Sequence, residues 1–169
     1  LRVLGTLSRR VGGIRAGSAG LVYFVDLAGD RILRRERPNR PWRRMVEPSS
    51  RFVAHTLAVA DVIVAIGDPD VPSAADIVER QCEPAAWRTY ASLGGGTTTL
   101  KPDLYLETAA TNDVEYVAAH FVEVDLGGES IPTLLRKCHA YELYRRTGTE
   151  QTQYGSFPRV LWSLTHRDP

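Results

Sequence analysis

Three acidic residues and one lysine have the types and the spacing that phosphodiester chemistry uses. Residues 121–126 alternate apolar and acidic side chains, so as a β-strand they would place Glu123 and Asp125 on one face. Two carboxylates on one strand face repel each other unless a cation, a proton or water relieves the repulsion. Asp103 begins another strand-like run, and Lys137 lies in a helical segment further along. This pattern predicts a divalent-metal site.

Each of these residues has an expected role. Metal-dependent phosphodiester cleavage needs carboxylates that hold Mg²⁺ or Mn²⁺ and a cation that stabilises charge at the phosphate. Asp103 and Glu123 would be ligands if their strands pair antiparallel through a turn at 111–113, and Asp125 would be a third ligand or support the other two. Lys137 would supply the cation. The alternative is structural: a surface ion pair between Glu123 and Lys137, with Asp103 capping a strand end and Asp125 accepting backbone donors.

The elements that would position these residues follow the order helix, three strands, helix, strand. They are expected at 50–66 (helix), 76–82, 98–107 and 115–126 (strands), 130–148 (helix) and 160–164 (strand). This order predicts an α/β domain over residues 49–169, with a mixed sheet flanked by helices. The second helix is expected to bury a stripe formed by Ile131, Leu134, Leu135 and Cys138.

The charge is unevenly distributed along the chain. Residues 1–50 carry eleven Arg and four acidic residues, so this part has a net charge of +7 and the remainder −6, within a total of +1. A basic first part predicts a polyanion such as double-stranded DNA as its partner. Arg15, near the tip of an expected hairpin, and Arg40, Arg43 and Arg44, in a proline-containing linker at 36–48, are the expected nucleic-acid contacts. For any single Arg, the alternative is solvated surface charge.

Residues 1–35 have the pattern of the C-terminal part of a winged helix. Residues 1–10 are expected to end a helix, 11–15 and 21–25 to form a basic hairpin, and Asp26 to cap a helix that runs to about Arg35. An ordinary hairpin packed on a core is the alternative. By analogy, a winged helix beside a second DNA-acting domain favours a homodimer on duplex DNA. The chain begins with Leu, so we expect residues to precede it.

Composition narrows the class of protein. With 43% hydrophobic and 24% charged residues, the chain has the composition of a soluble globular protein. No uninterrupted apolar run reaches the roughly 20 residues of a bilayer span, and no signal-peptide pattern is present, so we expect a cytoplasmic protein without a membrane partner. Cys82 and Cys138 are too far apart in the sequence for a C-x-x-C pair, and the four His show neither nucleophile nor zinc-site spacing.

The acidic motifs resemble those of the PD-(D/E)xK nuclease superfamily. Pro102-Asp103 matches its PD, and Glu123-Val124-Asp125 takes the place of its (D/E)xK. Asp125 stands where that superfamily has lysine; some members carry the lysine on the following helix, a position that Lys137 fits. The resemblance implies a restriction-endonuclease-like core that uses Mg²⁺ or Mn²⁺ to cut DNA.

A further set of motifs runs along nearly the whole chain: 55–61, Glu83-Pro84 with Trp87-Arg88, 100–103, 121–125 with Glu129-Ser130, Lys137-Cys138 with Tyr141, and 157–160. As a set these motifs resemble the replication-relaxation family of actinobacterial plasmids, phages and integrative elements, and this resemblance is the closer one. It implies a winged helix joined to a nuclease-like domain, with replication or mobilisation proteins as possible partners, and it makes Glu83 and Tyr141 secondary site candidates. Two functions stay open: a metal-dependent DNA endonuclease or nickase, and a non-catalytic DNA-binding replication-control factor on a degenerate nuclease scaffold.

Overall fold

The chain divides into two compact units, Leu1–Thr56 and Leu57–Pro169. The computed structural model describes residues 3–7, 21–36, 46–68, 70, 75–92, 94–110 and 113–165. The domain boundary predicted at residue 49 lies just before helix α2 (Ser50–Gly67), whereas the two units meet within that helix. Each unit is described by itself below.

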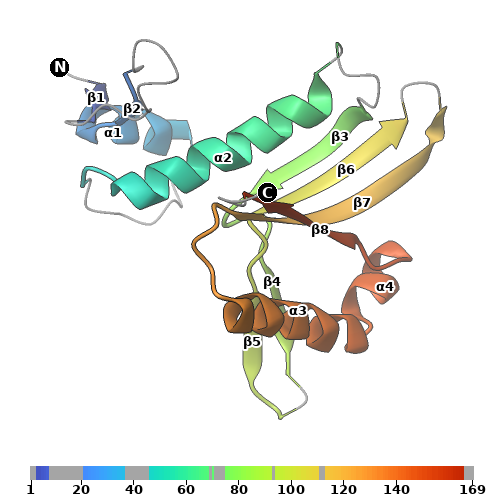
Figure 1. Cartoon of the computed structure of the whole chain (residues 1–169). Coiled ribbons are helices and arrows are strands. Elements are labelled where there is room, and N and C mark those ends of the chain that lie inside the picture. Colours follow the sequence, from blue (N-terminus) through green and yellow to red (C-terminus); the bar gives the residue numbers. More distant parts are fainter. Residues whose placement is uncertain are drawn as a thin grey trace. The chain divides into compact units, whose positions relative to one another are not determined.

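The first unit contains a small antiparallel pair of strands and a helix. Strand β1 (Leu4–Thr6) pairs with β2 (Tyr23–Val25), and helix α1 (Leu27–Glu36) follows (Figure 1). The helix begins directly after Asp26, as predicted, and a side-chain oxygen of Asp26 accepts a hydrogen bond from the backbone N–H of Leu27 at 2.7 Å.

The prediction of a helix over residues 1–10 is wrong, because Leu4–Thr6 is a strand. Gly5 is buried under the ring of Phe24, and a Cβ at this position would lie 2.6 Å from that ring. Leu1, Leu4 and Leu7 have helical spacing, but three residues are too short a pattern to distinguish a helix from a strand. Strand pairing outweighs it here. The expected strand at 11–15, with Arg15, and the linker arginines Arg40, Arg43 and Arg44 lie outside the described residues, so the winged helix stays a prediction.

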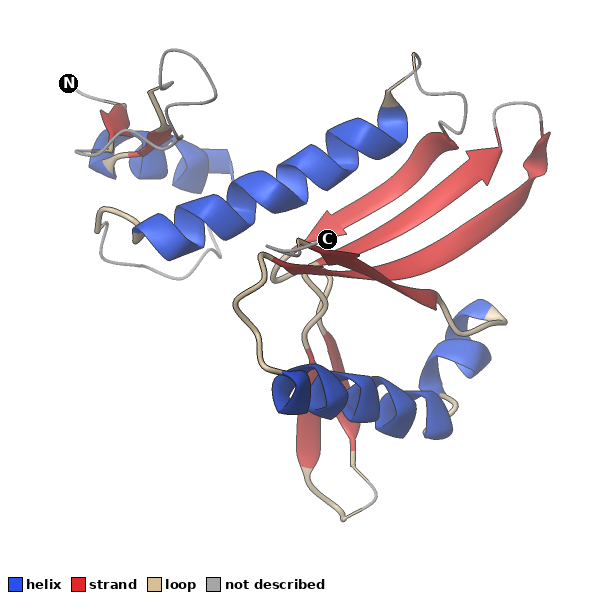
Figure 2. Ribbon diagram, in the orientation of Figure 1, coloured by secondary structure: helices blue, strands red, loops and turns tan. Residues whose placement is uncertain are grey.

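The second unit is built on a four-stranded mixed sheet, as predicted. Its order is β3-β6-β7-β8, where β6 is antiparallel to both of its neighbours, β3 and β7, and β8 runs parallel to β7 (Figures 1 and 2). A parallel neighbour requires a crossover connection, which helices α3 and α4 supply. The bounds are β3 Ala75–Cys82, β6 Leu104–Ala110, β7 Asp113–Asp125, α3 Ile131–Arg146, α4 Thr149–Tyr154 and β8 Arg159–Leu164.

The two faces of this sheet pack against different helices. Leu104, Leu106, Val122 and Val124 pack with Val59 of α2 on one face. The alternate residues Tyr105 and Phe121 pack with Tyr141 and Tyr144 of α3 on the other. Because side chains alternate along a strand, Glu123 points to the α3 side.

Helix α2 matches the helix predicted at 50–66, but only one of its sides packs on the sheet. Ala58, Val62 and Ile63 lie against the sheet, whereas Leu57 and Val64 are exposed, although the sequence of this helix is apolar on both sides. Within the described part of the chain, α2 alone is long and apolar enough to cross a membrane. One such helix is weak evidence for a membrane span.

The single strand predicted at 98–107 is two strands. Strand β5 (Thr97–Leu100) pairs with β4 (Arg88–Ala91) in a separate two-stranded sheet, and β6 begins only at Leu104. Pro102 lies between them and has no N–H to give to a ladder, which explains the break. The break places Asp103 at the mouth of β6.

The predicted apolar stripe of α3 is also wrong. Ile131 and Leu135 are 72% and 63% exposed, and Cys138 is exposed, whereas Tyr141 and Tyr144 are buried. The helix packs on the core through its second half, where the rings of the two tyrosines supply the apolar area. As a result, α3 presents tyrosine hydroxyl groups as well as rings to the sheet.

Candidate functional site

Asp103 joins the mouth of β6 to β7. Its carboxyl group is buried, and Oδ2 accepts a hydrogen bond from the backbone N–H of Val124 at 2.7 Å. A carboxylate that accepts a buried N–H is both held in place and partly compensated for its lost hydration. Asp103 therefore has a fixed position beside the residues of β7 that flank Val124.

Glu123 is buried in β7 and accepts two hydrogen bonds from α3. Lys137 Nζ lies 2.9 Å from Oε2, and the Tyr141 hydroxyl lies 2.6 Å from Oε1. The two donors are four residues apart and share a helix face. Burial raises the pKa of the Glu123 carboxyl above its ordinary value, opposed by the bonds from Tyr141 and Lys137 and assisted by the nearby charge of Asp103.

Lys137 lies between two carboxylates. Its Nζ is 2.9 Å from Glu123 and 2.8 Å from Oε1 of Glu129. Burial lowers the pKa of Lys137, but the two carboxylates together outweigh that effect and the pKa is raised, so the side chain stays an ammonium ion. Burial and the Glu123 carboxylate likewise raise the pKa of Tyr141, which keeps its hydroxyl protonated and able to donate.

Asp125 holds the turn that follows β7. Its Oδ1 accepts the backbone N–H groups of Gly128 at 3.1 Å and Glu129 at 3.3 Å. Gly127, with φ of 73°, makes this turn possible, and a Cβ there would lie 2.5 Å from the carbonyl oxygen of Thr165. Asp125 thus positions Glu129, which in turn contacts Lys137.

The structure brings together four of the predicted site residues: Asp103, Glu123, Lys137 and Tyr141. Glu83 does not join them, since it is exposed and accepts a hydrogen bond from Trp87 Nε1 at 3.1 Å. The contacts of Asp103 and Asp125 with backbone N–H groups are those of the structural alternative. The ion pair of Glu123 differs from that alternative, because this glutamate is buried.

The described residues contain no group of three or more His, Cys, Asp or Glu arranged to hold a metal ion. Mg²⁺ in proteins is often bound by one or two carboxylates, with waters and substrate phosphates as the other ligands. Asp103 and Glu123 meet that smaller requirement, because they lie on neighbouring strands and their charges interact. These two carboxylates are the residues that would hold such an ion, and metal binding, with Asp125 as a third ligand, stays a prediction.

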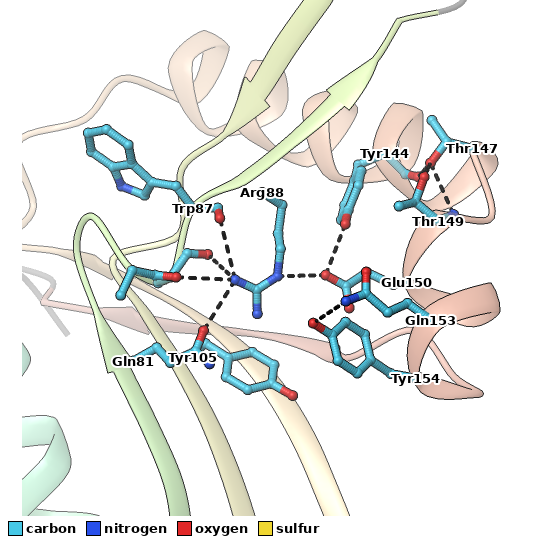
Figure 3. A network of polar contacts seen from close by, with 12 residues as sticks. Gln81, Trp87, Arg88, Tyr105, Tyr144, Thr147, Thr149, Glu150, Gln153 and Tyr154 are labelled. Atoms are coloured by element: carbon cyan, nitrogen blue, oxygen red, sulfur yellow. Dashed lines mark hydrogen bonds and ion pairs between the residues drawn. The ribbon is translucent and has the colours of Figure 1, made fainter.

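Sequence reasoning missed a second buried cluster on the same side of the sheet. Arg88 Nε lies 2.7 Å from Oε1 of Glu150, which also accepts the Tyr144 hydroxyl at 2.9 Å (Figure 3). Arg88 also donates to Gln81 and to the carbonyl oxygen of Ala86. The ion pair joins residues 62 positions apart, so no local pattern could reveal it. Glu129 was missed as a partner of Lys137 because it lies in a turn, which the side chain of Asp125 holds.

Comparison with protein families finds one matching model, described as replication-relaxation, over residues 1–160. That match spans both compact units and includes Asp103, Glu123, Glu129 and Lys137. Neither the curated proteins nor the solved structures include a significant match to the chain.

Proposed function

Because the chain belongs to the replication-relaxation family, we propose that it acts on DNA in the replication or maintenance of a plasmid or another mobile element. Family membership suggests a role in replication. The excess of arginine in residues 1–50 supports double-stranded DNA as the partner, because cationic side chains that neutralise phosphates release counterions. Arg15, Arg40, Arg43 and Arg44 are the proposed phosphate contacts.

We further propose a PD-(D/E)xK-like core that works as a divalent-metal-dependent DNA endonuclease or nickase. The order α2, β3, β6, β7, α3, β8 supports this assignment by analogy of fold. The observation that carries it is the placement of two buried carboxylates, Asp103 and Glu123, on neighbouring strands, with the ammonium group of Lys137 at Glu123.

In this proposal each residue has a separate task. Asp103 and Glu123 would hold Mg²⁺ or Mn²⁺, which when bound supplies Lewis-acid polarisation of a phosphate and lowers the pKa of a bound water. Lys137, kept protonated by Glu123 and Glu129, would stabilise negative charge on the scissile phosphate. Tyr141 fixes the orientation of the Glu123 carboxylate through its 2.6 Å hydrogen bond.

A specific observation favours a second candidate, a non-catalytic DNA-binding replication-control factor on the same scaffold. Both oxygens of Glu123 already accept hydrogen bonds, one from Lys137 and one from Tyr141. In addition, Asp125 stands at the strand position where the nuclease superfamily has lysine. In this case the cluster would stabilise the fold, and DNA binding would not depend on Asp103.

Cleavage of supercoiled plasmid by the full-length protein tests the first candidate. The assay would compare Mg²⁺, Mn²⁺ and EDTA for the wild type, Asp103→Asn and Glu123→Gln, which are nearly isosteric changes. Glu79→Gln, an exposed acid on β3, is the matched control. We expect nicking only with metal, lost in both site variants and retained in the control. Metal-dependent nicking that persists in both site variants would overturn the assignment of the site.

Binding to the same DNA tests the second candidate. If the wild type does not nick, and the wild type and Asp103→Asn bind equally with a steep dependence on salt, the non-catalytic function is supported. Combined replacement of Arg40, Arg43 and Arg44 by Ala should then weaken binding. A wild type that neither cuts nor binds DNA would contradict both candidates.

A further inference from the structure

A pocket of about 320 Å³ lies between α3 and β8. From α3 its lining includes Cys138, Tyr141 and Arg145, which are three and four residues apart and therefore share a helix face. From β8 it includes Val160 and Trp162, which as alternate strand residues share a face of the sheet. The pocket is therefore formed by regular secondary structure on both sides.

The pocket has the chemistry of a site for a flat ring. Its walls include three aromatic side chains, those of Tyr141, Phe157 and Trp162. The ammonium group of Lys137 lies 5.8 Å from the centre of the Trp162 ring, within the range of a cation–π contact. Aromatic rings stack on nucleobases with little sequence preference, because every base has a π-face.

The pocket is continuous with the candidate site. Tyr141 lines the pocket and donates its hydroxyl to Glu123, while Lys137 bonds Glu123 and lies over the ring of Trp162. In a nucleotide the base is joined to the phosphate through one sugar. A strand with a phosphate at Lys137 would therefore bring a base to the adjoining pocket.

The cations around the pocket each stand beside a carboxylate. Arg145 contributes to the lining, and Arg146 follows it on the exposed side of α3. Both arginines pair with Glu142, and Lys137 at the candidate site pairs with Glu123 and Glu129. The three cations can contact a phosphate, and the aromatic walls carry the recognition of a base.

We propose that this pocket binds one unstacked base of single-stranded or locally opened DNA, with the base stacked on Trp162 and its backbone near Lys137 and Arg145. This inference rests on the proposed action on DNA and adds the form of the substrate. A paired base cannot offer its face to the pocket without leaving the stack. The chain is therefore assigned a preference for DNA with accessible bases.

Two oligonucleotides of equal length separate base binding from phosphate binding. One consists of thymidines and the other of abasic sugar-phosphates, so they carry the same charge and differ only in the bases. Fluorescence anisotropy with the full-length protein should show tighter binding of the thymidine strand. Trp162→Ala should weaken that binding roughly 5- to 100-fold, the effect of losing one base–aromatic stack, and leave the abasic strand unchanged. Trp162→Phe should retain part of the preference.

The chain offers a matched control for the tryptophan. Trp87 also has a lysine over its ring, with Lys101 Nζ at 4.7 Å, but it does not line the pocket. Trp87→Ala should leave the preference for thymidine unchanged. If Trp162→Ala does not fold, as judged by circular dichroism, Cys138→Phe fills the pocket from an exposed position and should abolish the preference in a folded protein.

The possible failures are distinguishable. Equal binding of the two strands by the wild type, or an unchanged preference in both Trp162→Ala and Cys138→Phe, would overturn the pocket assignment and leave the action on DNA intact. Absence of binding to either strand and to duplex would overturn both proposals. A dimer that Cys138→Phe dissociates, with base preference unchanged, would assign the pocket to a second copy of the chain and overturn the inference.

Discussion

Two buried glutamates in the sheet unit have the same kinds of partner. Glu123 accepts the hydroxyl of Tyr141 at 2.6 Å, and Glu150 accepts that of Tyr144 at 2.9 Å. The two tyrosines are three residues apart on α3, and each glutamate also pairs with one cationic side chain. By composition alone the two clusters are equivalent.

They differ in what surrounds the cation. Arg88 is 13% exposed, and its guanidinium bonds Glu150 and the carbonyl oxygen of Ala86 while it lies over the ring of Tyr105. The planar fork holds Oε1 of Glu150, while its Oε2 is buried without a hydrogen-bond partner among the described residues. Lys137 is 31% exposed and is shared between Glu123 and Glu129.

The difference separates a structural cross-link from a site where ligands can exchange. The pair of Arg88 and Glu150 ties the β4–β5 hairpin to α4. Lys137 is partly exposed, bonds the second carboxylate of Glu129, and lies over the ring of Trp162, which lines the pocket. A buried ion pair is weak evidence for function by itself. An accessible cation beside a second carboxylate and a pocket is stronger evidence.

Replacing Arg88 by Met should have the largest effect on stability, because it leaves the Glu150 carboxylate buried without a cation. Breaking one side of a buried pair costs roughly 3–5 kcal/mol of unfolding free energy. Urea denaturation measures the loss. Adding Glu150→Gln should recover part of it by removing the uncompensated charge. Unchanged stability in Arg88→Met would contradict the assignment of the Arg88–Glu150 pair as a structural cross-link.

Lys137→Met should be less destabilising than Arg88→Met. We expect a loss of about 1–2 kcal/mol of unfolding free energy, a value between those for exposed and buried ion pairs. Water reaches this side chain and can solvate the carboxylates it leaves. Its effect on DNA binding or cleavage should nevertheless exceed that of Arg88→Met when equal amounts of folded protein are compared. Plasmid nicking and anisotropy at one salt concentration measure this, with Lys137→Arg as the charge-preserving control. The reverse ranking would contradict the assignment.

The pKa of Glu123 predicts how the stability of the first cluster varies with pH. Because this pKa is raised on folding, the folded state binds the proton more tightly than the unfolded state does. The stability that proton binding contributes is complete below the ordinary pKa of 4.5 and is lost as pH rises through the raised value. Glu123→Gln cannot ionise. Its stability relative to the wild type should therefore increase over this pH window in EDTA. Urea midpoints at a series of pH values would show it, and a flat difference would contradict the raised pKa.

Glu142→Gln should have the smallest effect, because this glutamate pairs with Arg145 and Arg146 on the surface. Hydrogen bonds from these two arginines lower the pKa of Glu142 to about 2. Any stabilisation is therefore present above pH 4.5 and lost as the pH falls towards 2. We expect no measurable change in the urea midpoint at pH 7. A clear decrease in the urea midpoint would mean that solvent exposure does not determine how much each of these ion pairs contributes to stability.

Long periodic segments of the fold were predictable from the sequence. The apolar stretch of α2, the alternation in β7 and the Ser130-Ile131-Pro132 start of α3 each have a strong local signal. Short elements lacked one. The four residues of β4 give too little alternation to distinguish a strand from a turn. Pro102, in contrast, is a local signal for the break between β5 and β6.

The site was predictable where partners lie on elements with clear periodicity. Asp103, Glu123 and Lys137 follow from an antiparallel strand pair and the helix after it. Glu129 lies in a turn held by the side chain of Asp125, and turns of this kind depend on hydrogen bonds that spacing does not reveal. The buried face of α3 was mispredicted because tyrosines, counted as half polar, carry most of its packing.

The backbone amide of Val124 reports on the state of Asp103, because it donates its hydrogen bond to that side chain. Leu104 and Val122 are the last residues that β6 and β7 pair at this end, and beyond them a side-chain oxygen, 2.7 Å away, takes the place of a backbone carbonyl. Protection of the Val124 amide against deuterium exchange therefore depends on a carboxylate whose charge can be altered. Any ligand that draws Asp103 away will speed exchange at this position, so occupancy of the site can be followed without a catalytic assay.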